Sequence, residues 1–233
     1  MKNRPTVLIT GAAGALGRAV ATAFHEEGWR LAVLDLSERA LAAAYPAEDA
    51  GYLLLPADLL DEAATARAVE HAVARFGRIE ALCNLAGGFD MGPPVHETTP
   101  AQWQKMQDLN VHTLLNSVRA VVPKMLAAGG GRIVNVAAMG GLAGRPYQGA
   151  YGASKSAVIR LTEAMAAELR EKCINVNCVL PSILDTPANR AAMPDADFGK
   201  WVAPADLARV ILFLCSEAAR AIHGAAIPVV GLS

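Results

Sequence analysis

The sequence has almost no excess of charge of either sign. Its 21 lysine and arginine residues nearly balance 22 aspartate and glutamate residues, which leaves a formal net charge of −1. We therefore expect no general attraction to nucleic acid or to an anionic membrane surface. Long hydrophobic runs are also missing: the first apolar run stops at Gly11, and Arg18 interrupts the next one. Neither a transmembrane helix nor an export signal is predicted, and the cytoplasm is the expected location.

Cysteine and histidine are too few and too scattered for a disulfide framework or a metal centre. The cysteines show no Cys-x-x-Cys spacing and have no histidine-rich partner segment; they are Cys83, Cys173, Cys178 and Cys215. The histidines lack the spacing of metal ligands; they are His25, His71, His96, His112 and His223. The sequence therefore predicts reduced thiols in the core and no metal site.

The chain does contain a regular alternation of short β-like runs and longer amphipathic runs. The predicted strands are Val7–Thr10, Leu31–Asp35, Tyr52–Pro56, Ala81–Leu85, Arg132–Ala137, Asn175–Leu180 and Ala226–Val230. The predicted helices are Ala15–Glu27, Asp61–Phe76, Ala101–Ala127, Ala150–Lys172 and Ala205–Ser216. Strands that are apolar nearly throughout are typical of a parallel sheet with helices on both faces. We predict one doubly wound α/β domain of the Rossmann type over residues 1–233, with about seven strands.

A glycine-rich turn follows the first predicted strand and opens the first predicted helix. Gly11 permits a sharp bend, Gly14 lets the backbone approach a pyrophosphate, and Gly17 permits close packing of helix on strand. The N-terminus of a helix also supplies oriented N–H donors to phosphates. Because ordinary turns need glycine too, it is the placement between strand and helix that predicts dinucleotide binding. The other turn positions expected at the cofactor are Ala13, Ala15 and Leu16.

Asp35, at the end of the second predicted strand, bears on the choice of cofactor. A carboxylate there can accept hydrogen bonds from the adenosine ribose and repels a 2′-phosphate. Leu36 comes next in the chain, and the nearest cation is expected to be Arg39. These positions predict NAD, with NADH preferred over NADPH. The alternative is that Asp35 merely ends a strand.

Tyr151 and Lys155 lie four residues apart near the start of a predicted helix. Residues at this spacing share a helical face, so the ammonium can lie near the phenol. A free tyrosine titrates near 10, and acid–base catalysis at neutral pH benefits from a lower pKa. The pair predicts a proton donor, although Tyr-x-x-x-Lys without the glycine turn would be an ordinary surface pattern.

With these features the chain resembles the short-chain dehydrogenase/reductase family over essentially its whole length. Other stretches that carry the resemblance are Ala57-Asp58-Leu59, Asn84-Leu85-Ala86-Gly87, Leu109-Asn110-Val111, Arg132–Val136 and the stretch from Pro181 to Thr186. The resemblance implies an NAD(P)-dependent oxidoreductase in which Tyr151 is the general acid/base. It implies that Lys155 grips the nicotinamide ribose and lowers the tyrosine pKa, and that Asn110 organises a water relay to the lysine. The implied cofactor contacts, besides the glycine turn, are Asp58, Leu59, Asn84, Ala86, Gly87, Tyr151, Lys155, Pro181, Ile183 and Thr186.

Three positions depart from the family pattern. The glycine turn has Ala15 where a glycine is usual, and Leu85 replaces an asparagine. The serine that orients the substrate carbonyl in the family falls on Ala138, which cannot form that hydrogen bond. Losing such a donor can cost ~10²–10³ in rate. Ser154 and Ser156 are too close to the tyrosine in sequence to replace it simply.

Residues 184–201 resemble the corresponding segment of dihydropteridine reductase, a relative that also lacks the serine and uses NADH. A quinonoid pterin accepts hydride and a proton with less need for a serine clamped on a ketone. The resemblance therefore implies a small cyclic or conjugated carbonyl or quinonoid substrate. The alternative is a regulatory or structural protein that binds NAD with little turnover.

The pocket for that substrate is expected between residues 87–98 and 186–201. Their hydrophobic side chains either line an apolar pocket for a planar ligand or pack on one another; they are Phe89, Met91, Met193, Phe198 and Trp201. In related enzymes, the helices matching Ala101–Ala127 and Ala150–Lys172 pack against a second subunit. We therefore expect a homotetramer or a homodimer.

Overall fold

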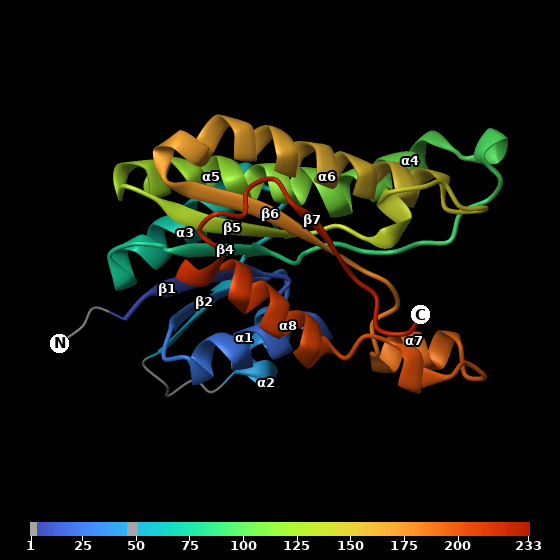
Figure 1. The fold of residues 1–233 in the computed structure, drawn as a ribbon, viewed down its shortest axis with the longest axis horizontal. Helices are drawn as coiled ribbons and strands as arrows, with labels where there is room; N and C mark the ends of the chain where they lie inside the picture. Colours follow the sequence, from blue (N-terminus) through green and yellow to red (C-terminus); the bar gives the residue numbers. More distant parts are fainter. Residues whose placement is uncertain (1–3, 46–50) are drawn as a thin grey trace.

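The computed structural model describes residues 4–45 and 51–233, which form a parallel sheet between two layers of helices (Figure 1). Seven strands run in the order β3-β2-β1-β4-β5-β6-β7, and every neighbouring pair is parallel. The strands are β1 (Thr6–Thr10), β2 (Arg30–Asp35), β3 (Tyr52–Pro56), β4 (Ala81–Asn84), β5 (Gly131–Val136), β6 (Ile174–Pro181) and β7 (Ala226–Val229). The predicted doubly wound sheet is confirmed; residues 1–3 and 46–50 of the predicted domain lie outside the described residues.

The sheet separates two hydrophobic clusters, one under each helical layer. One face is covered by α3 (Glu62–Phe76), α5 (Thr113–Ala127) and α6 (Gly149–Leu169). The other is covered by α1 (Ala15–Glu26), α2 (Glu38–Ala44) and α8 (Pro204–Leu214). Because both faces are buried, β1 is buried at every residue, and its apolar run Val7-Leu8-Ile9 agrees with the sequence prediction.

The predicted helix Ala101–Ala127 is divided in the structure. A first helix, α4 (Pro100–Gln107), gives way to a π-helical turn at Asp108–His112, and α5 comes after it. The start is as the sequence indicates: Thr99 caps α4 through a capping box with Gln102. A single π turn inside a helix is frequent at functional sites, and helical periodicity alone does not reveal it.

Two short helices escape sequence analysis because each is too short to show a helical period. Ser37 caps the first, α2, by accepting a hydrogen bond from Ala40 N. Thr186 caps the second, α7 (Pro187–Ala192), whose first residue is a proline. Each cap favours the start of a helix, but the apolar pattern that comes after it is too short to predict one.

The thiols are free, and only one departs from the prediction that they lie in the core. Cys173 is exposed, in a left-handed backbone conformation at the start of the connection to β6, whereas the other three are buried. Over residues 4–45 and 51–233, no group of three or more His, Cys, Asp or Glu side chains is arranged to hold a metal ion. No helix in the same ranges combines the length and apolar character needed to cross a membrane.

Candidate active site

The sheet order places the site at the carboxyl ends of β1 and β4. These neighbouring strands lead to opposite halves of the sheet, and ligands bind in the crevice outside such a switch point. Thr10, at the end of β1, ties the two strand ends together: its Oγ1 accepts hydrogen bonds from Leu85 N at 3.0 Å and Ala86 N at 3.1 Å. The turn after β1 and the segment after β4 therefore face a common crevice.

The glycine turn has no room for larger residues. Gly11 is left-handed, with φ +64°, and a Cβ atom there would lie 2.9 Å from the Ala86 backbone. A Cβ on Gly17 would lie only 2.3 Å from the Gly11 carbonyl oxygen. In the described chain no side chain caps α1 at Gly14, so the N–H groups of Ala15, Leu16 and Gly17 stay available. This cradle fits a dinucleotide pyrophosphate.

Asp35 and Arg18 both reach the turn, from opposite sides. Ala13 N donates to Asp35 Oδ2 at 3.0 Å, which leaves the other carboxylate oxygen for a ribose hydroxyl. Leu36 is 71% exposed beside it. Arg18 Nη1 donates to Ala13 O at 3.1 Å, so a guanidinium lies nearer to the turn than the sequence analysis expected. The expectation named Arg39 as the nearest cation. It did not take into account that the Arg18 side chain, in the first turn of α1, reaches back to the Ala13 carbonyl.

Tyr45 is a supporting residue that sequence analysis missed. Its hydroxyl donates to Ala12 O at 2.6 Å, and its ring is buried beneath the turn. Burial raises the pKa of this phenol far above its usual value. It therefore serves as a neutral hydrogen-bond donor that fixes the turn. No local motif distinguishes such a tyrosine, which comes after a short helix well away from the glycines.

The positions predicted at the adenine half hold their own turns in place. Asp58 Oδ1 accepts from Leu60 N at 2.8 Å. The Leu59 side chain is in the core, so only its backbone can face a ligand. Asn84 Nδ2 donates to Asn135 Oδ1 at 2.9 Å and joins β4 to β5, and Asn84 Oδ1 is buried without a partner among the described residues. Ala86 and Gly87, the next predicted contacts, come shortly after Asn84, and Ala86 N is already bonded to Thr10 Oγ1.

Of the predicted catalytic residues, Lys155 and Asn110 lie together around Gly87. Lys155, buried on α6, donates from Nζ to Val136 O at 3.0 Å. A Cβ atom on Gly87 would lie 2.7 Å from Asn110 Oδ1 and 3.3 Å from Lys155 Nζ. Only glycine allows the chain after β4 to pass this closely between the amide and the ammonium.

The π turn accounts for the position of Asn110. Its amide donates to Gly88 O at 3.0 Å and to Ser154 Oγ at 3.1 Å, while its Oδ1 accepts from Gly88 N at 3.0 Å. These bonds tie the helix to the loop after β4 and to α6. Ser154 Oγ in turn donates to Tyr151 O, and Ser156 Oγ to Gly141 O. Both serine hydroxyls are thus engaged, in agreement with the prediction that neither replaces a serine at Ala138.

Burial shifts the two titrating groups in opposite directions. It raises the pKa of Tyr151 to about 12 and lowers the pKa of Lys155 to about 8. The sequence analysis expected the lysine to lower the tyrosine pKa. In the protein without cofactor, desolvation of the phenolate by burial instead raises that pKa.

The predicted cofactor contacts Pro181, Ile183 and Thr186 lie at and after the carboxyl end of β6. Pro181 ends the strand, and Ile183 O accepts from Val202 N at 2.9 Å, which anchors the next segment. Thr186 Oγ1 accepts from Asn189 N at 3.2 Å as the cap of α7. The Thr186 hydroxyl therefore already has a role in folding, and it can still donate its own proton to a ligand.

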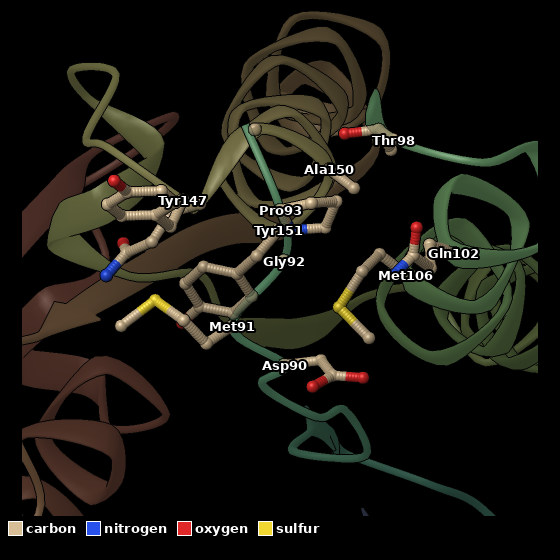
Figure 2. Close-up of a pocket in the computed structure, with 12 residues that line it drawn as sticks. Asp90, Met91, Gly92, Pro93, Thr98, Gln102, Met106, Tyr147, Ala150 and Tyr151 are labelled. Atoms are coloured by element: carbon tan, nitrogen blue, oxygen red, sulfur yellow. The ribbon is translucent and has the colours of Figure 1, made fainter. Parts of the chain in front are cut away.

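A pocket opens beside Tyr151 (Figure 2). Its lining includes Met91, Met106 and Tyr147, so much of the wall is apolar. Phe89 packs edge-on against the Tyr151 ring, with centroids 4.8 Å apart. The loop after β4 therefore covers one side of the phenol.

The aromatic residues of the segment 186–201 pack differently from Phe89. Phe198 and Trp201 pack on each other at 4.8 Å between ring centroids, and the Arg190 guanidinium lies over Phe198. Trp201 is buried. For this pair, the alternative of hydrophobic residues packing on one another holds. Met193 remains partly exposed.

Comparison with known proteins agrees with this geometry. The short chain dehydrogenase family matches residues 5–197. The 2-(R)-hydroxypropyl-CoM dehydrogenase of Xanthobacter autotrophicus is 33% identical over 94% of each chain. The cis-4-hydroxycyclohexanecarboxylate dehydrogenase of Sinomonas cyclohexanicum is 31% identical over 96% of this chain and 94% of the relative.

Solved structures show the same fold with either cofactor. The carveol dehydrogenase of Mycobacterium avium in complex with NAD has a TM-score of 0.89 and 28% identity, and covers 97% of this chain and 96% of its own. ElxO with NADP bound has a TM-score of 0.90 and 26% identity over 98% of each chain. The glycine cradle and the family match lead to one conclusion: the chain belongs to the short-chain dehydrogenase family and is an NAD(P)-dependent oxidoreductase.

Proposed function

We propose that the protein transfers hydride between NAD(H) and a small cyclic or conjugated carbonyl or quinonoid substrate, with Tyr151 as the general acid/base. The observation that carries this proposal is the position of Tyr151 at the wall of a pocket, on the same helix as Lys155, whose ammonium lies with the Asn110 amide around Gly87. A protein that only bound the dinucleotide would have no use for a phenol at the pocket wall. For that reason we favour an active enzyme over a regulatory or structural role.

Each side chain has a distinct part in the reaction. The nicotinamide, when bound, supplies or accepts the hydride. Tyr151 donates a proton to the substrate oxygen during reduction, or removes one during oxidation. Lys155, held by Val136 O, places a positive charge near the phenol and can bond ribose hydroxyls. Asn110 fixes the loop after β4 through Gly88, so the crevice keeps its shape.

The lining of the pocket supports a flat and largely apolar substrate. Met91 lines the pocket and Phe89 packs on the Tyr151 ring; both are more than half exposed, at 59% and 57%, and offer surface to a ring. One relative is named for a cyclohexane ring. Ala138 cannot form the hydrogen bond that would orient an isolated ketone, and an electron-poor conjugated ring depends less on such a bond. The resemblance of residues 184–201 to dihydropteridine reductase also favours a conjugated ring as the substrate.

A substrate screen tests this proposal directly. NADH oxidation would be followed by absorbance with quinonoid dihydropterin, 1,4-naphthoquinone and cyclohexanone, and NAD reduction with cis-4-hydroxycyclohexanecarboxylate. We expect turnover of at least one ring compound. NADH binding without turnover of any of them would contradict the proposal and restore the binding-protein alternative.

We predict that NADH binds at least about tenfold more tightly than NADPH, because the Asp35 carboxylate faces the 2′-phosphate. Asp35→Asn keeps an acceptor for Ala13 N but removes the negative charge. This variant should bind NADH and NADPH with more similar affinities, because the nearby Arg18 guanidinium can then attract the 2′-phosphate. Glu38→Gln, on exposed α2, is the matched control. Fluorescence titration with both cofactors measures this, and equal affinities in the parent protein would remove the role assigned to Asp35.

We also predict a homotetramer or a homodimer. Helices α5 and α6 form one outer layer of the molecule (Figure 1), and Ala164 and Ala167 face outward from α6. Small side chains let a partner helix approach closely. Light scattering at micromolar concentration should give two or four times the 24.3 kDa chain mass. A mass of one chain would contradict both assemblies.

A further inference from the structure

The pocket beside Tyr151 contains one side-chain amide that is not engaged elsewhere. Of the other polar side chains there, Asp90 forms a 2.6 Å ion pair with Lys105, and Gln102 accepts from Thr99 in the α4 cap. Gln148 lines the same pocket, and the described chain offers its amide no hydrogen-bond partner. The hydroxyls of Thr98 and Tyr147 lie apart from the Tyr151 ring in Figure 2.

The Gln148 amide and the Tyr151 ring flank the same residue. A Cβ atom on Gly140 would lie 3.3 Å from Gln148 Oε1 and 3.5 Å from Tyr151 Cε1. Gly140 belongs to the 3₁₀ turn Met139–Gly141, which Ala138 precedes. The amide therefore lies against the segment where the structure has an alanine and no hydroxyl.

The backbone before α6 holds Gln148 in this position. Tyr147 has φ +62°, a left-handed conformation that costs a non-glycine residue about 1 kcal/mol or more. Its carbonyl accepts from Gly92 N at 2.8 Å, which ties it to the loop after β4. Gln148, three residues before Tyr151, is the N-cap residue that precedes α6. Strain that the surroundings hold next to a pocket is typical of functional sites.

We infer that the Gln148 amide is the second hydrogen-bonding group of the substrate site, which fixes the reacting oxygen beside the Tyr151 hydroxyl. This inference rests on the proposed function. During reduction the carbonyl carbon gains hydride, the oxygen gains the Tyr151 proton, and the amide N–H bonds that oxygen without losing its proton. An amide offers both a donor and an acceptor, so it can also hold an alcohol. Gln148 thereby supplies the orientation that alanine at 138 cannot.

The test is Gln148→Met, which keeps the length of the side chain and removes both hydrogen-bonding groups. We expect kcat to fall about 10²-fold, the scale for one oriented donor, while NADH affinity stays unchanged. Gln148→Glu, matched in shape but without a donor when ionised, should show a similar loss. Gln104→Met, on the exposed side of α4 where Gln104 bonds only Asp108, is the control and should keep parental rates. The probes are NADH with quinonoid dihydropterin, 1,4-naphthoquinone and cyclohexanone.

A second substitution separates a direct role from a general disturbance. The double variant Ala138→Ser/Gln148→Met should have a kcat at least about tenfold higher than that of Gln148→Met alone, because the serine returns a hydroxyl to the same wall of the pocket. Parental rates in both Gln148 variants, with the parent active, would overturn this inference and leave the proposed function standing. A parent that turns over none of the three probes nor cis-4-hydroxycyclohexanecarboxylate would overturn the proposed function and this inference with it.

Discussion

Tyr151→Phe is expected to lower kcat by about 10³-fold, within the range for loss of a general acid, while NADH affinity changes less than about twofold. In the proposed mechanism the phenol contacts the reacting oxygen, whereas the glycine turn would hold the cofactor pyrophosphate. Steady-state rates with the best substrate of the screen, and fluorescence titration with NADH, measure the two effects separately.

Tyr52→Phe is the matched control for this variant. Tyr52 begins β3, at the end of the sheet opposite to the site, and stacks on His25. It should keep the parental rate. Full activity in Tyr151→Phe would show that water or the substrate delivers the proton, and the assignment of Tyr151 would be wrong.

Lys155→Met is expected to impair both turnover and cofactor binding, in contrast to the tyrosine variant. The ammonium lies beside Gly87 and Asn110, at the centre of the crevice, so its loss removes charge from both functions. We expect kcat/KM to fall about 10³-fold and NADH affinity to fall about tenfold. Unchanged NADH affinity would mean that the lysine does not contact the cofactor.

The same variant should change how stability depends on pH. Because burial lowers the pKa of Lys155 to about 8 in the folded state, the unfolded chain binds more protons above that pH. The free energy of unfolding of the cofactor-free parent should therefore rise by about 2 kcal/mol between about pH 7.5 and 9.5, relative to Lys155→Met. The raised pKa of Tyr151 acts in the opposite direction only above pH 10. Urea unfolding at both pH values measures the difference, and parallel profiles would mean that Lys155 stays hydrated.

The sequence predicts the sheet well because strands buried on both faces leave a simple apolar signal. β1 and the glycine turn are examples: in each, one local requirement determines the residue types. The glycine positions also predict the crevice, since only glycine permits the contacts at Gly11, Gly17 and Gly87.

Features that depend on distant contacts are absent from the local pattern. The π turn at Asn110 is held by bonds to Gly88 and Ser154, which lie far away in sequence. Arg18 and Tyr45 reach the glycine turn through folding, and no motif marks them. The opposite pKa shifts of Tyr151 and Lys155 result from burial, which spacing along a helix does not specify.

In the proposed mechanism, proton transfer and substrate choice depend on different kinds of structure. Tyr151 and Lys155 are held by α6. The pocket beside Tyr151 is lined by the irregular segments 90–93 and 147–148, joined by the bond from Gly92 N to Tyr147 O, and by Gln102 and Met106 of α4. Loops accept substitutions and insertions more readily than helices do. A lineage can therefore exchange one ring-shaped substrate for another by changing these two segments, with the acid–base pair inherited intact. In laboratory evolution toward new substrates, libraries of variants should therefore be directed at these two segments.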